Sequence, residues 1–247
     1  MKTIIVTGAS AGIGLGIAQL FLEKGWNVVM NSSNSQNLEN AYESLPDKKN
    51  AMIVAGDVRD PQVGKRLVEA ALANFGQLDA LINNAGIFSP KPFLEADEQD
   101  LDGFYAVNLK GTFYSSQAAI SQMVKQGNGG AVINMGTVLV DHAIAGFPAA
   151  AAVASKGAIH ALTRQLAAEF GGNNIRVNTI SPGIIRSPLQ SKIGVEDADG
   201  LAGLHLLKRI GETSDIAQTA YHLVNSNFIT GATINVDGGH VSGHQFG

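Results

Sequence analysis

The segment KTIIVTGASAGIG, residues 2–14, joins a short apolar run to a glycine-rich turn and is the strongest indication of the fold in this chain. Glycines after a strand let the backbone turn tightly, and they bring the N-terminal amides of the next helix close to a bound pyrophosphate. Tight packing of a strand against a helix is the alternative explanation for such glycines. Because the turn lies at the first strand-to-helix junction of an alternating chain, it predicts dinucleotide binding, with a helix beginning near Ile13.

Outward from this segment, short apolar runs rich in valine and isoleucine alternate with stretches of helical spacing. The runs lie at residues 2–6, 27–30, 50–55, 78–83, 130–135, 174–180 and 231–236. This alternation predicts one α/β domain over residues 1–247, a Rossmann-type, doubly wound parallel sheet of about seven strands with helices on both faces. Residues 187–212 break the alternation and are predicted to form a substrate loop or lid.

The composition of the 247 residues argues against several classes of function. A net charge of −4 without a cluster of Lys or Arg offers no basic surface to nucleic acid. No segment approaches the ~20 apolar residues of a membrane span, so we expect neither a membrane nor a nucleic-acid partner. The chain has no cysteine for a disulfide or a thiolate metal site, and His240 and His244 lack nearby carboxylates of suitable spacing. The sequence therefore predicts a cytoplasmic protein without a bound metal.

The glycine-rich turn matches the pattern T-G-x-x-x-G-x-G through Thr7, Gly8, Gly12 and Gly14. Further motifs follow in order: GDV at 56–58, NNAG at 83–86, VNLKGTF at 107–113, RVNTISPGIIRSPL at 176–189 and FITGATINVDGG at 228–239. In this order they resemble the short-chain dehydrogenase/reductase family over nearly the whole chain. The resemblance implies an NAD(P)-dependent oxidoreductase that acts on a small carbonyl or alcohol substrate.

The resemblance also implies which residues contact the cofactor. They are Thr7, Gly8, Ser10, Gly12, Ile13, Gly14, Ser32, Ser33, Asp57, Val58, Asn84, Ala85, Gly86, Lys156, Pro182, Gly183, Ile185 and Ser187. Asp57 would bond the adenine edge and Val58 would pack on it, although an aspartate at a strand end can instead cap a turn. Pro182 and Gly183 would shape the loop that holds the nicotinamide amide, with Ser187 nearby.

The end of the second strand decides between NAD and NADP in this fold, because an acid there bonds the ribose hydroxyls and a basic residue accepts the 2′-phosphate. Ser32 stands at the acidic position and Ser33 at the basic one, so neither charge is present. Without the acid nothing repels a phosphate, and the hydroxyls offer neutral donors. The sequence therefore favours NADP slightly over NAD.

Members of the family typically carry Y-x-x-x-K on the helix after the fifth strand, with a serine about thirteen residues before the tyrosine. By resemblance the tyrosine exchanges the substrate proton, the lysine binds ribose, the serine orients the carbonyl, and an asparagine holds a water relay. Here the lysine is Lys156, the asparagine is Asn108, and Ala152 occupies the tyrosine position. Thr137, fifteen residues before Ala152, is the counterpart of the serine. A missing general acid typically costs about 10² to 10⁴ in rate, so ordinary carbonyl reduction should be weakened.

His142 is the candidate substitute for the tyrosine, because it follows Thr137 in an enlarged loop and histidine exchanges protons near neutral pH. The alternative is that His142 is a solvated loop residue. Three hypotheses follow for the chain: an oxidoreductase whose proton comes from His142 or ordered water, a catalytically weak cofactor-binding protein for sensing or assembly, or an active reductase with an engineered tyrosine-to-alanine change. The family resemblance also implies a homodimer or homotetramer, with the helices around 101–126 and 149–170 pairing across a two-fold axis.

Overall fold

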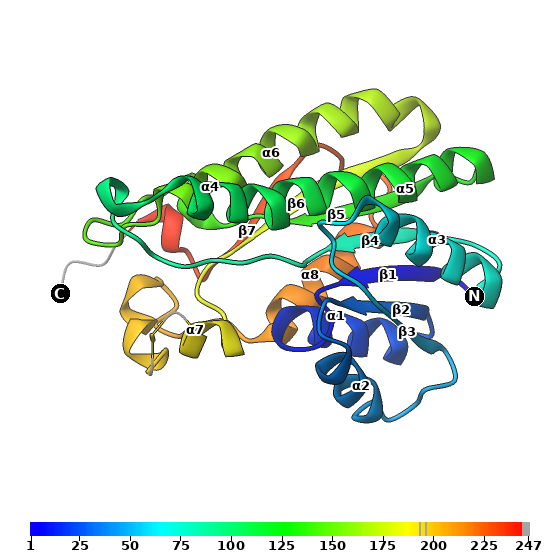
Figure 1. Ribbon diagram of the computed structural model, residues 1–247, viewed down its shortest axis with the longest axis horizontal. Coiled ribbons are helices and arrows are strands. Elements are labelled where there is room, and N and C mark those ends of the chain that lie inside the picture. The colour runs from blue at the N-terminus through cyan, green and yellow to red at the C-terminus, as the bar shows by residue number, and fades with distance from the viewer. Residues whose placement is uncertain (193, 196, 244–247) are drawn as a thin grey trace.

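The computed structural model describes residues 1–192, 194–195 and 197–243, and these form helical layers around one parallel sheet (Figure 1). The spatial order of the strands is β3-β2-β1-β4-β5-β6-β7. The strands are β1 (Thr3–Thr7), β2 (Asn27–Ser32), β3 (Ala51–Ala55), β4 (Ala80–Asn83), β5 (Gly130–Met135), β6 (Ile175–Pro182) and β7 (Thr233–Val236). The prediction of a doubly wound parallel sheet of about seven strands is confirmed.

Each predicted apolar run contains one strand, because a parallel strand buried on both faces is apolar along its length. The predicted bounds differ from the observed ones by one or two residues. The last strand begins at Thr233 rather than at residue 231, since Gly231 has a φ of +71° and turns the chain before pairing starts. The sixth strand continues to Pro182, which carries it to the loop predicted to hold the nicotinamide.

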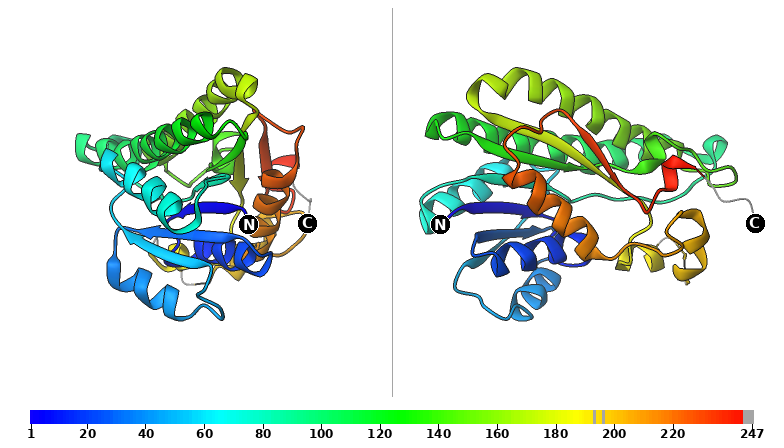
Figure 2. Two further views of the ribbon diagram at one scale, coloured as in Figure 1. Left: turned by 90° about the vertical axis from the view of Figure 1, so that its right-hand side faces the viewer. Right: turned by 180° about the vertical axis from the view of Figure 1, so that it is seen from behind.

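The helices cover the two faces of the sheet as two separate apolar layers, which Figure 2 shows from the side. The helices are α1 (Gly12–Glu23), α2 (Ser35–Glu43), α3 (Pro61–Phe75), α4 (Glu98–Phe104), α5 (Gly111–Gln126), α6 (Ala150–Phe170), α7 (Pro188–Lys192) and α8 (Thr213–Asn225). Helices α1, α2 and α8 cover one face, and α3, α5 and α6 cover the other. Phe21 of α1 is fully buried and contacts Trp26 and Tyr221 edge-on, so it joins α1 to α8.

The predicted helix over 101–126 differs from the observed structure in one respect. A π-helical segment, Tyr105–Lys110, separates α4 from α5. Asn108 lies within this segment and is fully buried. A π-helical turn accommodates an extra residue and is often found at functional sites, which the apolar spacing of the sequence does not reveal. The local widening therefore turns Asn108 toward the interior.

All carboxyl ends of the strands lie at the same edge of the sheet, on the side of α7 in Figure 1. The strand order reverses between β1 and β4, and ligands of open α/β sheets bind outside the carboxyl ends at such a point. In the described part of the chain, no helix combines the length and the apolar character needed to cross a membrane.

Candidate active site

The glycine-rich turn between β1 and α1 forms a cradle in which three positions are glycine. Gly8 and Gly12 have φ values of +65° and +55°, which other residues rarely adopt. A Cβ atom on Gly14 would lie 2.3 Å from the carbonyl oxygen of Gly8, so the turn closes only with glycine there. Ala11, the N-cap of α1, makes no side-chain capping bond within the described residues. The first amides of α1 therefore have no side-chain cap, which suits the binding of an anion.

Thr7 and Asn84 fasten the cradle to the neighbouring strand. The Thr7 hydroxyl accepts hydrogen bonds from the backbone N–H groups of Asn84 and Ala85, both at 3.1 Å. The Asn84 amide donates to the carbonyl oxygens of Thr7 and Gly8, both at 3.0 Å. These bonds hold the ends of β1 and β4 together where the strand order reverses, and they keep the cradle rigid.

The end of β2 presents hydroxyl groups instead of a charge. The Ser10 hydroxyl donates to Oγ of Ser32 at 3.0 Å, and Ser33 is exposed. The neighbouring strand end carries Asp57, whose carboxylate accepts the backbone N–H of Arg59 and pairs with its guanidinium at 2.6 Å. This pairing lowers the pKa of Asp57 and also matches the turn-capping alternative for that residue. Arg59, which the sequence analysis missed, brings a largely exposed positive charge to the turn after the strand beside Ser32.

Asn108 and Lys156 meet beside Gly86. A Cβ atom on Gly86 would lie 3.1 Å from Oδ1 of Asn108 and 3.2 Å from Nζ of Lys156, so a side chain there would press against both groups. Asn108 accepts the backbone N–H of Ile87 at 2.8 Å and donates to the Ser155 hydroxyl at 2.9 Å. These two bonds hold Asn108 between the loop after β4 and the helix that carries Lys156.

The Lys156 ammonium group is buried and donates to the carbonyl oxygen of Met135 at 2.7 Å. Desolvation disfavours the charged amine and lowers the pKa of Lys156 to about 8. A single carbonyl partner leaves further donor positions of the ammonium group for a bound ligand. The lysine is therefore a charged donor near neutral pH that loses its proton readily as the pH rises.

A cavity of about 730 Å³ opens next to this cluster. Several residues predicted to contact cofactor or substrate line it together, and they come from distant parts of the chain. They are Ile13, Asn84, Gly86, Thr137, Lys156, Pro182, Gly183, Ile185 and Ser187. Phe88 and Phe147, whose stacked rings have centroids 6.0 Å apart, add an apolar wall. Thr137 lies at the start of the loop after β5, and its hydroxyl accepts the backbone N–H of Leu139 at 3.3 Å.

Three residues predicted from the catalytic pattern do not line this cavity in the described structure: Asn108, Ala152 and His142. Ala152 is fully buried, and its carbonyl oxygen accepts the hydroxyl of Ser155 at 2.7 Å. His142 contacts the ring of His240 instead, with centroids 5.2 Å apart. His240 does line the cavity, although the sequence analysis considered it only as a tail residue for metal binding. Its position after Gly238 and Gly239 is the signal that could have indicated a close approach to the cleft.

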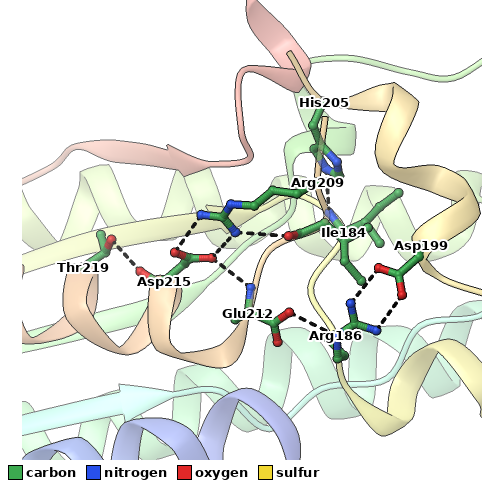
Figure 3. Close-up of polar contacts among 9 residues, drawn as sticks. Ile184, Arg186, Asp199, His205, Arg209, Glu212, Asp215 and Thr219 are labelled. Atoms are coloured by element: carbon green, nitrogen blue, oxygen red, sulfur yellow. Dashed lines mark hydrogen bonds and ion pairs between the residues drawn. The ribbon is translucent and has the colours of Figure 1, made fainter. Parts of the chain in front are cut away.

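Residues 187–212 form one side of the cavity through α7 and the 3₁₀ helix Asp199–Leu204. Leu189, Leu201 and Leu204 supply apolar lining there. Figure 3 shows Arg186 between Asp199 and Glu212, with N–O distances of 2.6 and 3.0 Å. This guanidinium ties the beginning, middle and end of the segment together. Residues 193 and 196 of the predicted lid lie outside the described residues, as does His244.

Comparisons with known proteins agree with this geometry. A family model described as enoyl-(acyl carrier protein) reductase matches residues 8–241. The solved structure of a short-chain type dehydrogenase/reductase from Mycobacterium marinum is 28% identical, with a TM-score of 0.91 over 97% of this chain and 95% of the other. The chain is a short-chain dehydrogenase/reductase.

Other relatives of this short-chain dehydrogenase/reductase carry named activities. The 3-oxoacyl-[acyl-carrier-protein] reductase FabG of Thermotoga maritima is 33% identical over 244 residues, covering 96% of this chain and 97% of that protein. The L-rhamnose-1-dehydrogenase of Scheffersomyces stipitis is 32% identical over 248 residues, covering 96% and 95% of the two chains. The solved structure of ElxO with NADP bound is 29% identical, with a TM-score of 0.88 over 98% and 99% of the two chains. These relatives support an oxidoreductase.

Proposed function

We propose that the chain is an NADP(H)-dependent reductase of small carbonyl compounds, or a dehydrogenase of the matching alcohols, whose proton does not come from tyrosine. The observation that carries this proposal is the shared cavity, in which Lys156, Thr137 and the loop of Pro182 and Gly183 lie together. A site with these groups can hold a nicotinamide and a carbonyl side by side. Ala152 at the tyrosine position is what separates it from the usual chemistry of the family.

The residues present fit a dinucleotide. The cradle of Gly8, Gly12 and Gly14 and the open N-terminus of α1 suit a pyrophosphate, because their backbone amides can donate to it. Lys156 has donor positions for ribose hydroxyls. NADP is favoured over NAD because no carboxylate stands at Ser32 or Ser33, and because the NADP-bound ElxO has the same fold. Asp57 carries a negative charge near this position, but its ion pair with Arg59 neutralises it.

Each polar residue of the site would have its own role in carbonyl reduction. NADPH, when bound, would supply a hydride to the carbonyl carbon. The hydroxyl of Thr137 would donate to the carbonyl oxygen and orient it, and the ammonium group of Lys156 would stabilise the negative charge that develops nearby. Asn108 would hold Ile87 and Ser155 in position through its amide. The apolar walls would exclude water from the reacting atoms.

The substrate class follows from the lining of the cavity. Its walls are mainly apolar, with Phe88, Phe147 and the leucines of residues 187–212 opposite a few polar groups. Such a lining suits a small carbonyl compound with an apolar or weakly polar body. The named relatives act in their own systems on a 3-oxoacyl group and on rhamnose, so a 3-oxoacyl thioester and a sugar belong among the first compounds tested.

The assembly and location are part of the same proposal. Leu101, Phe113 and Val124 of α4 and α5 are exposed, and each has 40% or more of its surface accessible. A second copy of the chain would bury them if these helices paired across a two-fold axis, as in a homodimer or homotetramer. We propose that this assembly works in the cytoplasm.

The decisive assay follows NADPH and NADH oxidation over ketones, sugars, quinones and a 3-oxoacyl thioester, for the parent and two variants. We expect the parent to oxidise NADPH with at least one carbonyl. The His142→Ala variant should lose turnover while it still binds NADPH, if the histidine loop feeds the proton. The Ala152→Tyr variant should gain little turnover, because under this proposal the proton comes from another group. Absence of NADPH binding at millimolar concentration would contradict the whole proposal.

One observation favours a second candidate, a cofactor-binding protein with little catalysis and a role in sensing or assembly. Ala152 is buried beside the catalytic cluster, and among the described residues that line the cavity no tyrosine is present. In that case NADPH would bind without turnover in the parent, and Ala152→Tyr would produce a large gain of activity. The same three proteins therefore distinguish the two candidates.

A further inference from the structure

Two histidines from distant parts of the chain, His142 and His205, each contact the ring of His240 beside the cavity. His240 lies in the middle, with its ring centroid 5.2 Å from that of His142 and 5.8 Å from that of His205. His142 comes from the loop after β5, His205 from the end of residues 187–212, and His240 from the turn after β7. Contacts between three segments that the sequence keeps apart give a continuous row of imidazoles.

The backbone around His240 is held rigidly. The preceding Gly238 and Gly239 have φ values of +57° and +87°, and the Asp237 carboxylate accepts the backbone N–H groups of Gly239 and Val241, both at 2.9 Å. His240 itself is 1% exposed and lines the cavity that also contains Lys156 and Thr137. Its imidazole is therefore fixed at the wall where a substrate would lie.

His205 is the inner end of the row. Its Nε2 atom accepts the backbone N–H of Ile184 at 3.2 Å, so the neutral ring carries its proton on Nδ1 (Figure 3). That Nδ1 atom is buried, and the backbone of Arg209 acts on the ring as a hydrogen-bond acceptor that raises its pKa. A buried donor usually has an acceptor, such as an ordered water. His205 also borders a second cavity of about 800 Å³.

His142 is the outer end of the row. It is half-buried in the loop after the 3₁₀ helix Val138–Val140, next to the exposed Asp141. A partly exposed imidazole can exchange protons with bulk water. The same ring contacts the ring of His240. Ring contacts therefore run from the half-buried His142 to the wall of the cavity.

We propose that His240 is the group that gives the proton to the substrate oxygen in reduction, and that His142 and His205 return a proton to it. This inference rests on the proposed carbonyl reduction. The hydride and its electron pair go to the carbonyl carbon, the C=O π pair becomes the new O–H bond, and the proton leaves the His240 imidazolium. Neutral His240 then takes one proton from water through His142 or through His205, so the protein ends each turnover unchanged. In alcohol oxidation every transfer runs in reverse.

The charged groups around the row influence its proton affinity from both sides. Asp141 adjoins His142, Asp237 lies beneath His240 and beside His205, Arg209 faces His205, and Lys156 borders the same cavity as His240. Burial lowers the pKa of His205, while Asp237 acts in the opposite direction. Burial, the largest influence, therefore favours the neutral form of His205.

The test compares the full-length parent with His240→Gln, which keeps a polar side chain but cannot titrate, and with His222→Gln as the matched control. His222 is an exposed histidine of α8 with a 3.2 Å contact to Ser226. We expect His240→Gln to lower kcat for ketone reduction by about 10² or more while the NADPH Kd stays within twofold. The parent rate should fall as the pH rises through the pKa of the proton donor. In His240→Gln this decrease of the rate at high pH should be absent. His222→Gln should behave like the parent.

A second readout does not need turnover. In a ¹³C-histidine NMR titration, the His240 resonance should shift when NADPH is added and again in a His142→Gln background, while His222 stays unmoved. An active parent whose rate and pH profile survive His240→Gln would overturn the inference and leave the proposed function intact. A parent that binds NADPH without turnover would overturn the proposed function. In that case His240 has no substrate oxygen to protonate, and the inference fails together with the proposed function.

Discussion

The cofactor side of the site offers mainly backbone groups to its ligand, and the substrate side offers mainly side chains. On the cofactor side, from β1 to β2, the groups that would hold the ligand are backbone amides and the spaces left by Gly8, Gly12 and Gly14. On the substrate side, the contacts come from side chains such as Thr137, His240 and the leucines of residues 187–212. The cofactor side follows its family closely, whereas the substrate side lacks the tyrosine.

Backbone contacts and side-chain contacts therefore differ in how well they tolerate substitutions. A backbone cradle fails when a side chain is added, because the added atoms have no space. A side-chain site can change its chemistry at one position while the surrounding geometry survives. Asn108 donates to Ser155 and Lys156 donates to the Met135 carbonyl in a site that has alanine at position 152. The comparison predicts large losses on the cofactor side and graded changes on the substrate side.

The largest effect is expected for Gly14→Val. The new Cβ atom would lie 2.3 Å from the Gly8 carbonyl oxygen and would force the cradle open. We expect the NADPH Kd to rise by about 100-fold or more, together with a lower unfolding temperature. Fluorescence titration and a thermal melt would measure both. Gly103→Ala in α4 is the control, since a Cβ atom there meets nothing within 4 Å.

The next largest effect is expected for Ser32→Asp. A carboxylate at the end of β2 would repel the 2′-phosphate of NADPH and could bond the ribose hydroxyls of NADH. We expect the ratio of the NADPH to the NADH Kd to rise roughly 30-fold, measured by titration at low salt. Ser32→Ala separates the loss of the hydroxyl from the added charge. An unchanged ratio in the aspartate variant would argue against a 2′-phosphate site at this strand end.

A smaller effect on cofactor affinity is expected when the pH rises through the pKa of Lys156. Burial lowers the pKa of Lys156 to about 8, so the ammonium form dominates below pH 8 and is lost above it. Because the ribose would bind the protonated form, cofactor affinity should fall as the pH rises, roughly fivefold between pH 8 and pH 9. Calorimetric titrations would measure this slope. Lys156→Met should bind weakly at every pH, and a sloping profile in that variant would assign the titration to another group.

The smallest effect is expected for Arg186→Gln. Arg186 pairs with Asp199 and Glu212, but these side chains are at least half exposed, so water and salt weaken the pairs. We expect the substrate KM to rise about twofold to threefold with little change in kcat, and the parent KM to approach that value at high salt. Lys48→Gln, which removes an exposed ion pair with Glu43, is the control. A large fall in kcat would mean that Arg186 acts on the reaction itself.

The strands of the sheet could be predicted from local sequence patterns. Each valine-rich and isoleucine-rich run became a parallel strand, because strands covered on both faces must be apolar along their length. The helical path around Asn108 could not be read in the same way. Its π-helical turn packs against other elements. Val58 lies so close to Gly111 that a Cβ atom on this glycine would be 2.6 Å from the valine side chain.

The sequence by itself determined the alternating fold, the glycine cradle, the neutral end of β2 and the absence of the tyrosine. These features are local, since each depends on residue type and on spacing within one segment. Only the tertiary structure decided that His240 lines the cavity, that His142 contacts it from behind, and that Arg186 joins the ends of residues 187–212. Those contacts join segments separated by about 100 residues in one case, and chain spacing carries no information about which loops meet at the edge of a sheet.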